Sequence, residues 1–156
     1  MKYQRLPMER LYPILEEQME GGGSGRLIVT GSSMLPTLRQ GRDSVVLKRP
    51  GTLQRGDIIL YRRQTGQYVL HRIIRVREDE FLCCGDNQWQ TERVERDQVL
   101  AVVAAVQRRG RNISAACLRF RVWTVIWLAL FPGRRPLIAV RRRLGRIKRF
   151  WKNRGC

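Results

Sequence analysis

The first part of the chain has the hydrophobic spacing of an amphipathic helix. Met8, Leu11, Leu15 and Met19 recur at intervals of three and four positions, and glutamates fall between them. Three successive glycines follow and end the pattern. The pattern predicts an N-terminal unit, residues 1–25, made of an amphipathic helix and a Gly-rich linker. We expect this helix to pack on the protein body, and contact with a membrane or a substrate is the alternative.

The middle of the chain changes to short apolar runs that are separated by turn residues. Such runs, bounded by Gly, Pro, Asn and Asp, are typical of β-strands. The candidate strands are residues 27–30, 44–48, 57–61, 68–76, 81–84 and 99–106. Their regular spacing predicts a mainly β fold, a coiled β-barrel or sandwich, for a central domain of residues 26–110.

A long apolar run and a basic stretch follow the predicted β domain. Residues 113–131 are largely apolar, and residues 122–131 carry no charge. The stretch 134–154 is rich in arginine with scattered apolar residues. We therefore predict a helical, basic, membrane-associating tail over residues 111–156.

The apolar run is poorly suited to crossing a membrane. A spanning helix needs about 20 apolar residues, and Arg119 and Arg121 interrupt this run. Each arginine would cost about 2.5–3.5 kcal/mol near the bilayer centre. We favour a helix that lies in the interface of an anionic membrane. A true span, and a helix folded onto the body, are the alternatives.

Charge separates the two halves of the chain. Residues 1–97 carry 16 Lys and Arg against all 13 acidic residues, whereas residues 98–156 carry 15 Lys and Arg and no acid. Such a basic tail favours anionic partners. An anionic membrane surface is the expected partner. Nucleic acid is disfavoured, because RNA binding does not need long apolar runs.

The four cysteines and the single histidine do not form a recognisable ligand pattern. Cys83 and Cys84 are adjacent, Cys117 and Cys156 are scattered, and no CxxC pair accompanies them. We therefore expect no metal and no cofactor. Unpatterned thiols favour a reducing compartment, and the N-terminus lacks the apolar run of a secretory signal. The expected location is the cytoplasmic membrane, with the active site favoured on its cytoplasmic face.

Three polar residues stand out as candidate chemistry. Ser33 follows a short apolar run in a Gly/Ser turn, but a serine needs a base to act as a nucleophile. His71, the only histidine, lies in a β-like run and titrates in the range of a general base. Asp86 lies in a Gly-Asp-Asn turn and is suited to orient an imidazole. Each residue alone is more typical of a structural role.

Together these segments resemble the signal peptidase superfamily, which also contains the LexA-type self-cleaving repressors. Four boxes occur in the family's order over about residues 26–106. They read Gly-Ser-Ser-Met-Leu-Pro-Thr-Leu at 31–38, Leu-Gln-Arg-Gly-Asp-Ile-Ile at 53–59, Leu-His-Arg-Ile-Ile-Arg-Val at 70–76 and Cys-Gly-Asp-Asn at 84–87.

The resemblance implies a role for each candidate. Ser33 directly precedes the methionine and corresponds to the nucleophile, and His71 stands at the position of the base. Many relatives have a lysine at that position, whereas the endoplasmic-reticulum and sporulation types have histidine with an aspartate, here Asp86. The Ser33 backbone N–H, next to Ser32, would serve the oxyanion hole. Gly31 departs from the hydroxyl residue that many signal peptidases carry as a second donor.

The sequence therefore predicts a serine endopeptidase of the signal-peptidase type that cleaves a peptide or preprotein. One alternative is a LexA-like module that cleaves itself or regulates a partner. The short segment before residue 26 counts against it, because LexA-type proteins carry a DNA-binding unit there. The other alternative is a non-enzymatic basic protein that binds lipid or RNA on the same fold.

Overall fold

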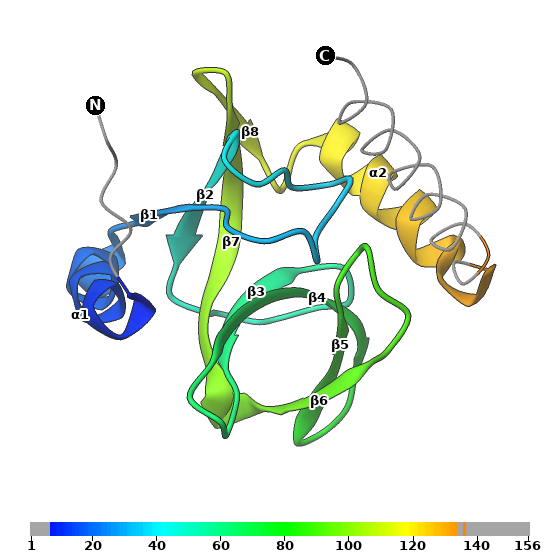
Figure 1. The fold of residues 1–156 in the computed structure, drawn as a ribbon, viewed down its shortest axis with the longest axis horizontal. Coiled ribbons are helices and arrows are strands. Elements are labelled where there is room, and N and C mark those ends of the chain that lie inside the picture. Colours follow the sequence, from blue (N-terminus) through cyan, green and yellow to red (C-terminus); the bar gives the residue numbers. More distant parts are fainter. Residues whose placement is uncertain (1–6, 134–135, 137–156) are drawn as a thin grey trace, which may run out of the picture.

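The computed structural model describes residues 7–133 and residue 136 (Figure 1). These residues form eight strands, two α-helices and three short 3₁₀ turns. In chain order they are α1 (Met8–Met19), η1 (Glu20–Gly22), β1 (Gly25–Ile28), β2 (Asp43–Lys48), β3 (Ile58–Arg62), β4 (Tyr68–Val76), β5 (Glu80–Cys84), β6 (Glu92–Glu95), η2 (Arg96–Gln98), β7 (Val99–Arg108), β8 (Arg111–Ser114), α2 (Leu118–Ala129) and η3 (Phe131–Gly133). The predicted mainly β fold is confirmed.

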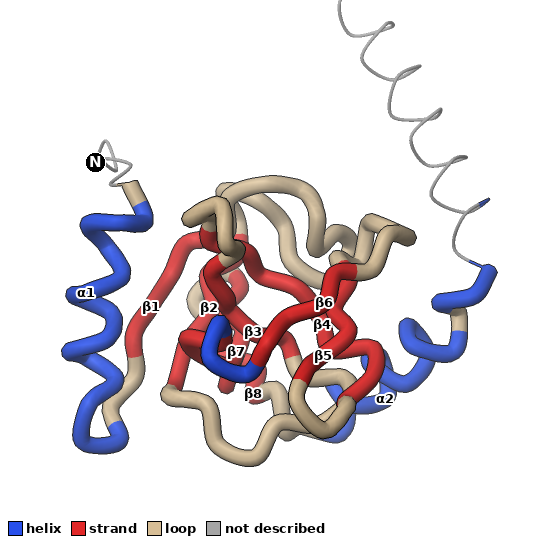
Figure 2. Tube along the Cα trace, turned by 90° about the horizontal axis from the view of Figure 1, so that it is seen from below, coloured by secondary structure: helices blue, strands red, loops and turns tan. Residues whose placement is uncertain are grey.

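All eight strands belong to one antiparallel sheet. The strand order is β1-β2-β7-β3-β4-β5-β6, and β8 pairs with the C-terminal part of β7. The sheet curls on itself, and α1 and α2 lie on opposite sides of it (Figures 1 and 2). This curl gives the half-barrel shape of the domain.

Two strands were missing from the sequence prediction. In β6 only Val94 is buried, and in β8 Ile113 is half-buried between exposed neighbours. Such short, polar strands give no readable alternation. The sheet continues past residue 110, because β8 pairs with β7 in a hairpin whose turn contains that residue.

The curled sheet encloses two apolar clusters, and β3 contributes to both. Ile58 and Leu60 face the first cluster, whereas Ile59 and Tyr61 face the second. Successive residues of a strand point to opposite faces. Both faces of β3 are therefore buried, which explains why its sequence is continuously apolar.

Helix α1 packs against the first cluster. Its residues Leu15 and Met19 are buried there, as the apolar spacing predicted. Gly25 of β1 makes the close approach possible, because a Cβ at that position would lie 2.8 Å from Leu15 Cδ2. The helix thus forms part of the core.

Helix α2 covers only part of the predicted helical run. Residues 113–117 belong to β8 and the turn that follows it, so the helix begins at Leu118. Within the described residues, no helix is long and apolar enough to cross a membrane. The prediction for the basic stretch 134–154 lies outside the described residues, apart from position 136.

A fully buried ion pair joins several of these elements. Arg72 of β4 donates from Nε to Asp86 Oδ1 at 2.9 Å and from Nη2 to Asp86 Oδ2 at 2.8 Å. Both side chains are 0% exposed. Arg72 Nη1 also donates to the Gly56 carbonyl at 2.9 Å and to Thr124 of α2 at 3.0 Å. The pair therefore connects β4, the loop after β5 and α2.

We expect Asp86→Leu to lower the free energy of unfolding by about 3–5 kcal/mol, because it leaves a buried guanidinium without a counter-charge. The double variant Arg72→Met/Asp86→Leu should recover much of this loss, because apolar residues can replace a buried pair at little cost. Urea denaturation of the wild type and both variants measures the difference. A double variant as unstable as the single one would contradict this account.

Candidate functional site

The segment that carries Ser33 is a series of turns between β1 and β2. We call residues 30–38 the serine segment. Met34 and Leu38 are buried in the first apolar cluster and anchor it. Gly31 has a φ of +92°, a conformation that favours glycine. Ser33 is half-buried, and no described residue accepts a hydrogen bond from its backbone N–H.

His71 lies in β4 and meets Ser33 at one cavity. This serine cavity has a volume of about 260 Å³, and Gly31, Ser33, His71 and Gln88 line it. His71 is only 1% exposed. The structure thus brings together the predicted nucleophile and the predicted base.

Gly85 lies between the two residues. A methyl group at Gly85 would be 2.7 Å from the Ser33 carbonyl oxygen and 3.1 Å from His71 Nε2. Asn87 lies two positions after Gly85 in the same turn. Its backbone N–H donates to the Ser33 carbonyl at 2.7 Å, and its side-chain N–H donates to the Ser32 carbonyl at 3.2 Å. The Gly-Asp-Asn turn therefore holds the serine segment beside His71 Nε2.

The other imidazole nitrogen faces a tyrosine and a glutamate. His71 Nδ1 lies 3.1 Å from the Tyr61 hydroxyl, which donates to Glu92 Oε2 at 2.9 Å. A carboxylate only accepts hydrogen bonds, so the Tyr61 proton is directed to Glu92 and the Tyr61 oxygen accepts Nδ1–H. His71 therefore carries its proton on Nδ1, and Nε2 is the free basic nitrogen.

Glu92 is held in its charged form. Burial alone would raise the pKa of this carboxyl, but hydrogen bonds from Arg63 and Tyr61 outweigh burial and lower the pKa. Arg63 Nε donates to Glu92 Oε2 at 2.8 Å. A fixed negative charge thus lies 3.7 Å from His71 Nδ1.

Burial dominates the titration of His71. It lowers the pKa of the imidazole to about 4, with Arg63 acting in the same direction, whereas the charges of Glu92 and Asp86 raise the pKa. The imidazole is therefore neutral at neutral pH and able to accept a proton.

Asp86 lies elsewhere than the sequence-based hypothesis required. Its two oxygens accept hydrogen bonds from Arg72, and one of them also from the Thr37 hydroxyl. In the part of the chain that the structure describes, Asp86 makes no hydrogen bond to His71. The contact predicted for Asp86 is made by Tyr61, with Glu92 behind it.

Ser32 also lies apart from the cavity. It is exposed and does not line the serine cavity, and its carbonyl accepts from the Leu35 backbone N–H at 3.2 Å and from Asn87. Its contribution is to hold the turn.

The sequence analysis missed Tyr61, Glu92, Gln88 and the steric role of Gly85. The register offers a signal for Tyr61: Ile59 of β3 pairs with His71, and Tyr61 lies two positions further on the same face. Glu92 lies in β6, which the sequence pattern did not reveal.

Most of the chain matches one family of known proteins. The family model described as Peptidase S24-like matches residues 3–107, which include α1 and the strands up to β7. No curated protein matches the chain significantly. The family supports a serine peptidase or a self-cleaving module of the LexA type. The chain belongs to the Peptidase S24-like family, in the superfamily that includes LexA-type proteins and signal peptidases.

Proposed function

We propose that this chain is a serine endopeptidase of the signal-peptidase type, with Ser33 as nucleophile and His71 as general base. The observation that carries the proposal is the meeting of Ser33 and the unprotonated Nε2 of His71 at one cavity, with Gly85 between them. Membership of a peptidase family supports the same chemistry.

The reaction follows from the state of the imidazole. Ser33 Oγ attacks the carbonyl carbon of the scissile peptide while Nε2 takes its proton, and the Ser33 backbone N–H stabilises the oxyanion. The imidazolium then gives the proton to the leaving amine, which departs and leaves an acyl-enzyme. Water attacks the acyl-enzyme and loses a proton to Nε2, which returns it to Ser33 as the acid product leaves.

Tyr61 and Glu92 act on His71 in this proposal, as positioning residues. Tyr61 fixes the Nδ1–H tautomer, and the Glu92 carboxylate stabilises the positive imidazolium that forms during each proton transfer. Asp86 has a structural role, because it holds the turn that contains Gly85. Its charge also raises the pKa of His71, but less than the charge of Glu92 does.

The substrate is proposed to bind as an extended strand. β1 pairs with β2 on one side, and no other described strand pairs with its free edge. Residues 27–31 at this edge line the serine cavity beside Ser33. Main-chain hydrogen bonds to such an edge recognise extended peptides. The small volume of the cavity, about 260 Å³, favours a small residue before the cleaved bond.

We expect Ser33→Ala to lower the rate of labelling by a fluorophosphonate probe by more than about 10³-fold, because the nucleophile is lost. Ser32→Ala is the matched control and should label at the wild-type rate, because Ser32 lies outside the serine cavity. Equal labelling of Ser33→Ala and wild type would overturn the proposal. Intact mass spectrometry of the same samples tests self-cleavage, which would appear as wild-type fragments that are absent from Ser33→Ala.

The acidity of His71 predicts the pH profile of labelling. The rate should be flat near neutrality and half-maximal near pH 4, because the imidazole is protonated below its pKa of about 4. In Glu92→Gln the half-maximum should move to lower pH, since the Glu92 charge raises the pKa of His71. The plateau should fall about tenfold to a hundredfold, as expected for the loss of a charged hydrogen-bond partner worth about 1.5–3 kcal/mol. Glu80→Gln, on β5, is the control, and an identical profile for both variants would exclude a positioning role.

The steric role of Gly85 has its own test. In Gly85→Ala the new Cβ meets the Ser33 backbone at 2.7 Å, so the serine segment must shift. A displacement of about 1 Å can lower the rate about 10²-fold, and we expect a labelling defect of this size with the circular dichroism of the wild type. Gly51→Ala, where a Cβ meets no atom within 4 Å, should label normally. Normal labelling of Gly85→Ala would show that the site tolerates the added methyl group.

A further inference from the structure

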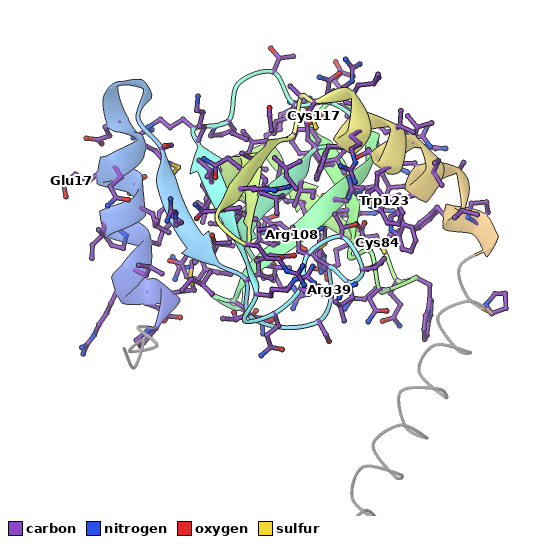
Figure 3. All side chains as sticks on the ribbon, turned by 90° about the horizontal axis from the view of Figure 1, so that it is seen from above. Glu17, Arg39, Cys84, Arg108, Cys117 and Trp123 are labelled. Carbon is purple, nitrogen blue, oxygen red and sulfur yellow. The ribbon has the colours of Figure 1, made fainter. Side chains whose placement is uncertain are left out.

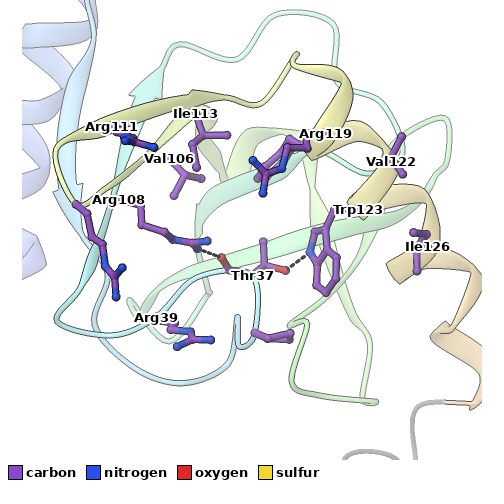
Figure 4. A pocket seen from close by; sticks show the side chains of 13 residues that line it. Thr37, Arg39, Val106, Arg108, Arg111, Ile113, Arg119, Val122, Trp123 and Ile126 are labelled. Atoms are coloured by element: carbon purple, nitrogen blue, oxygen red, sulfur yellow. Dashed lines mark hydrogen bonds between the residues drawn. The ribbon is translucent and has the colours of Figure 1, made fainter.

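A second, larger cavity lies on the far side of the serine segment. It has a volume of about 920 Å³ and is enclosed by the serine segment, the β7–β8 hairpin and α2 (Figure 4). Figure 3 shows Arg39 and Arg108 close together on this face, with Trp123 of α2 near them. We call it the arginine cavity, because five arginines line it.

The charge of the arginine cavity is strongly positive. Arg39, Arg108, Arg109, Arg111 and Arg119 line it, and none of the lining residues is acidic. Arg108 is bound to a buried carboxylate. The other four form no ion pair with any residue that the structure describes, and all four are exposed. Such a concentration of free guanidinium groups is suited to a phosphate-bearing ligand.

The other residues that line this cavity are mostly apolar, and some of them belong to α2. The large exposed apolar residues of the helix are Leu118, Val122, Val125 and Ile126, and Leu130 directly follows it, with exposed fractions of 78, 48, 65, 47 and 42%. Their spacing places them on one side of the helix, which they share with Arg119. Val122 and Ile126 also line the arginine cavity. The cationic cavity therefore opens directly beside an aliphatic face.

We propose that the arginine cavity binds the phosphate headgroup of an anionic phospholipid while the aliphatic face of α2 enters the acyl layer of the same membrane. Exposed apolar side chains beside guanidinium groups are suited to an anionic membrane surface, where the charges meet headgroups and the apolar side chains meet acyl chains. A free phosphate would leave the aliphatic face in water. RNA would likewise leave this face in water, because its charged backbone offers no acyl layer.

This lipid site adjoins the proposed active site. Thr37 of the serine segment lines the arginine cavity, and its carbonyl accepts from Arg108 Nη2 at 2.8 Å. The Thr37 hydroxyl accepts from Trp123 Nε1 at 3.0 Å (Figure 4). Lipid binding would thus hold the serine segment close to the membrane surface. The lipid site itself does not depend on the proposed peptidase activity.

The test is co-sedimentation of the full chain with two kinds of vesicle. One kind is phosphatidylcholine alone, and the other also contains about 30% phosphatidylglycerol, an anionic lipid that attracts basic residues. Arg39→Gln/Arg119→Gln should weaken partitioning onto the anionic vesicles about thirtyfold, since each arginine near such a surface contributes about one factor of five. The matched control, Arg62→Gln/Arg93→Gln, removes the same charge from strands away from the cavity and should change partitioning much less. Equal losses in the two double variants would mean that only net charge matters, and would overturn the proposal.

A second pair of variants tests the aliphatic face. Val125→Gln should weaken binding to the anionic vesicles, whereas Val76→Gln, which changes an exposed valine at the end of β4, should not.

Inorganic phosphate and a single-stranded RNA oligonucleotide are added as competitors. Release of the wild type by phosphate at low millimolar concentration would assign the site to a free anion. Binding of the RNA that Arg39→Gln/Arg119→Gln alone abolishes would assign it to nucleic acid, and either result would overturn the lipid site.

Discussion

The buried pair of Arg72 and Asp86 is the interaction on which the geometry of this protein depends. Neither charge can stay buried without the other, so their bidentate contact fixes β4 against the loop after β5. His71 precedes Arg72, and Gly85 precedes Asp86. The contact between Arg72 and Asp86 therefore also brings His71 and Gly85 together, and Gly85 lies against His71 Nε2. A structural ion pair thus sets the position of the chemical site.

The electrostatics around His71 combine two opposing effects. Burial favours the neutral imidazole, which is the form that accepts a proton. Glu92 favours the charged form, and it acts from the far side of the ring through Tyr61. Because the carboxylate is already in place and held by Arg63, the imidazolium finds its counter-charge without reorganisation of the site. In the proposed mechanism, His71 is therefore neutral at rest and stabilised when it becomes charged.

The local features of this fold could be predicted from the sequence better than its long-range contacts. Most strands could be read from apolar runs, and β4 begins and ends where the pattern predicted, at Tyr68 and Val76. Ser33 and His71, the proposed nucleophile and base, could be singled out from the sequence because each lies in a local box. Glu92 could not be found in this way, because its contact with Tyr61 spans 31 positions and depends on how the sheet curls. Asp86 was expected beside His71 from the resemblance, but its oxygens accept from Arg72, the next residue of β4, whose side chain points to the opposite face of the strand.

The contacts of α2 bear on where the functional unit ends. The family resemblance stops at residue 107, yet Thr124 accepts from Arg72 and Trp123 donates to Thr37. A domain cut at the limit of the resemblance would lose one partner of the central arginine and one partner of the serine segment. We therefore expect the smallest autonomous form of this fold to be longer than its family signature. An exchange of C-terminal regions between relatives would have to supply an equivalent hydroxyl and an equivalent indole.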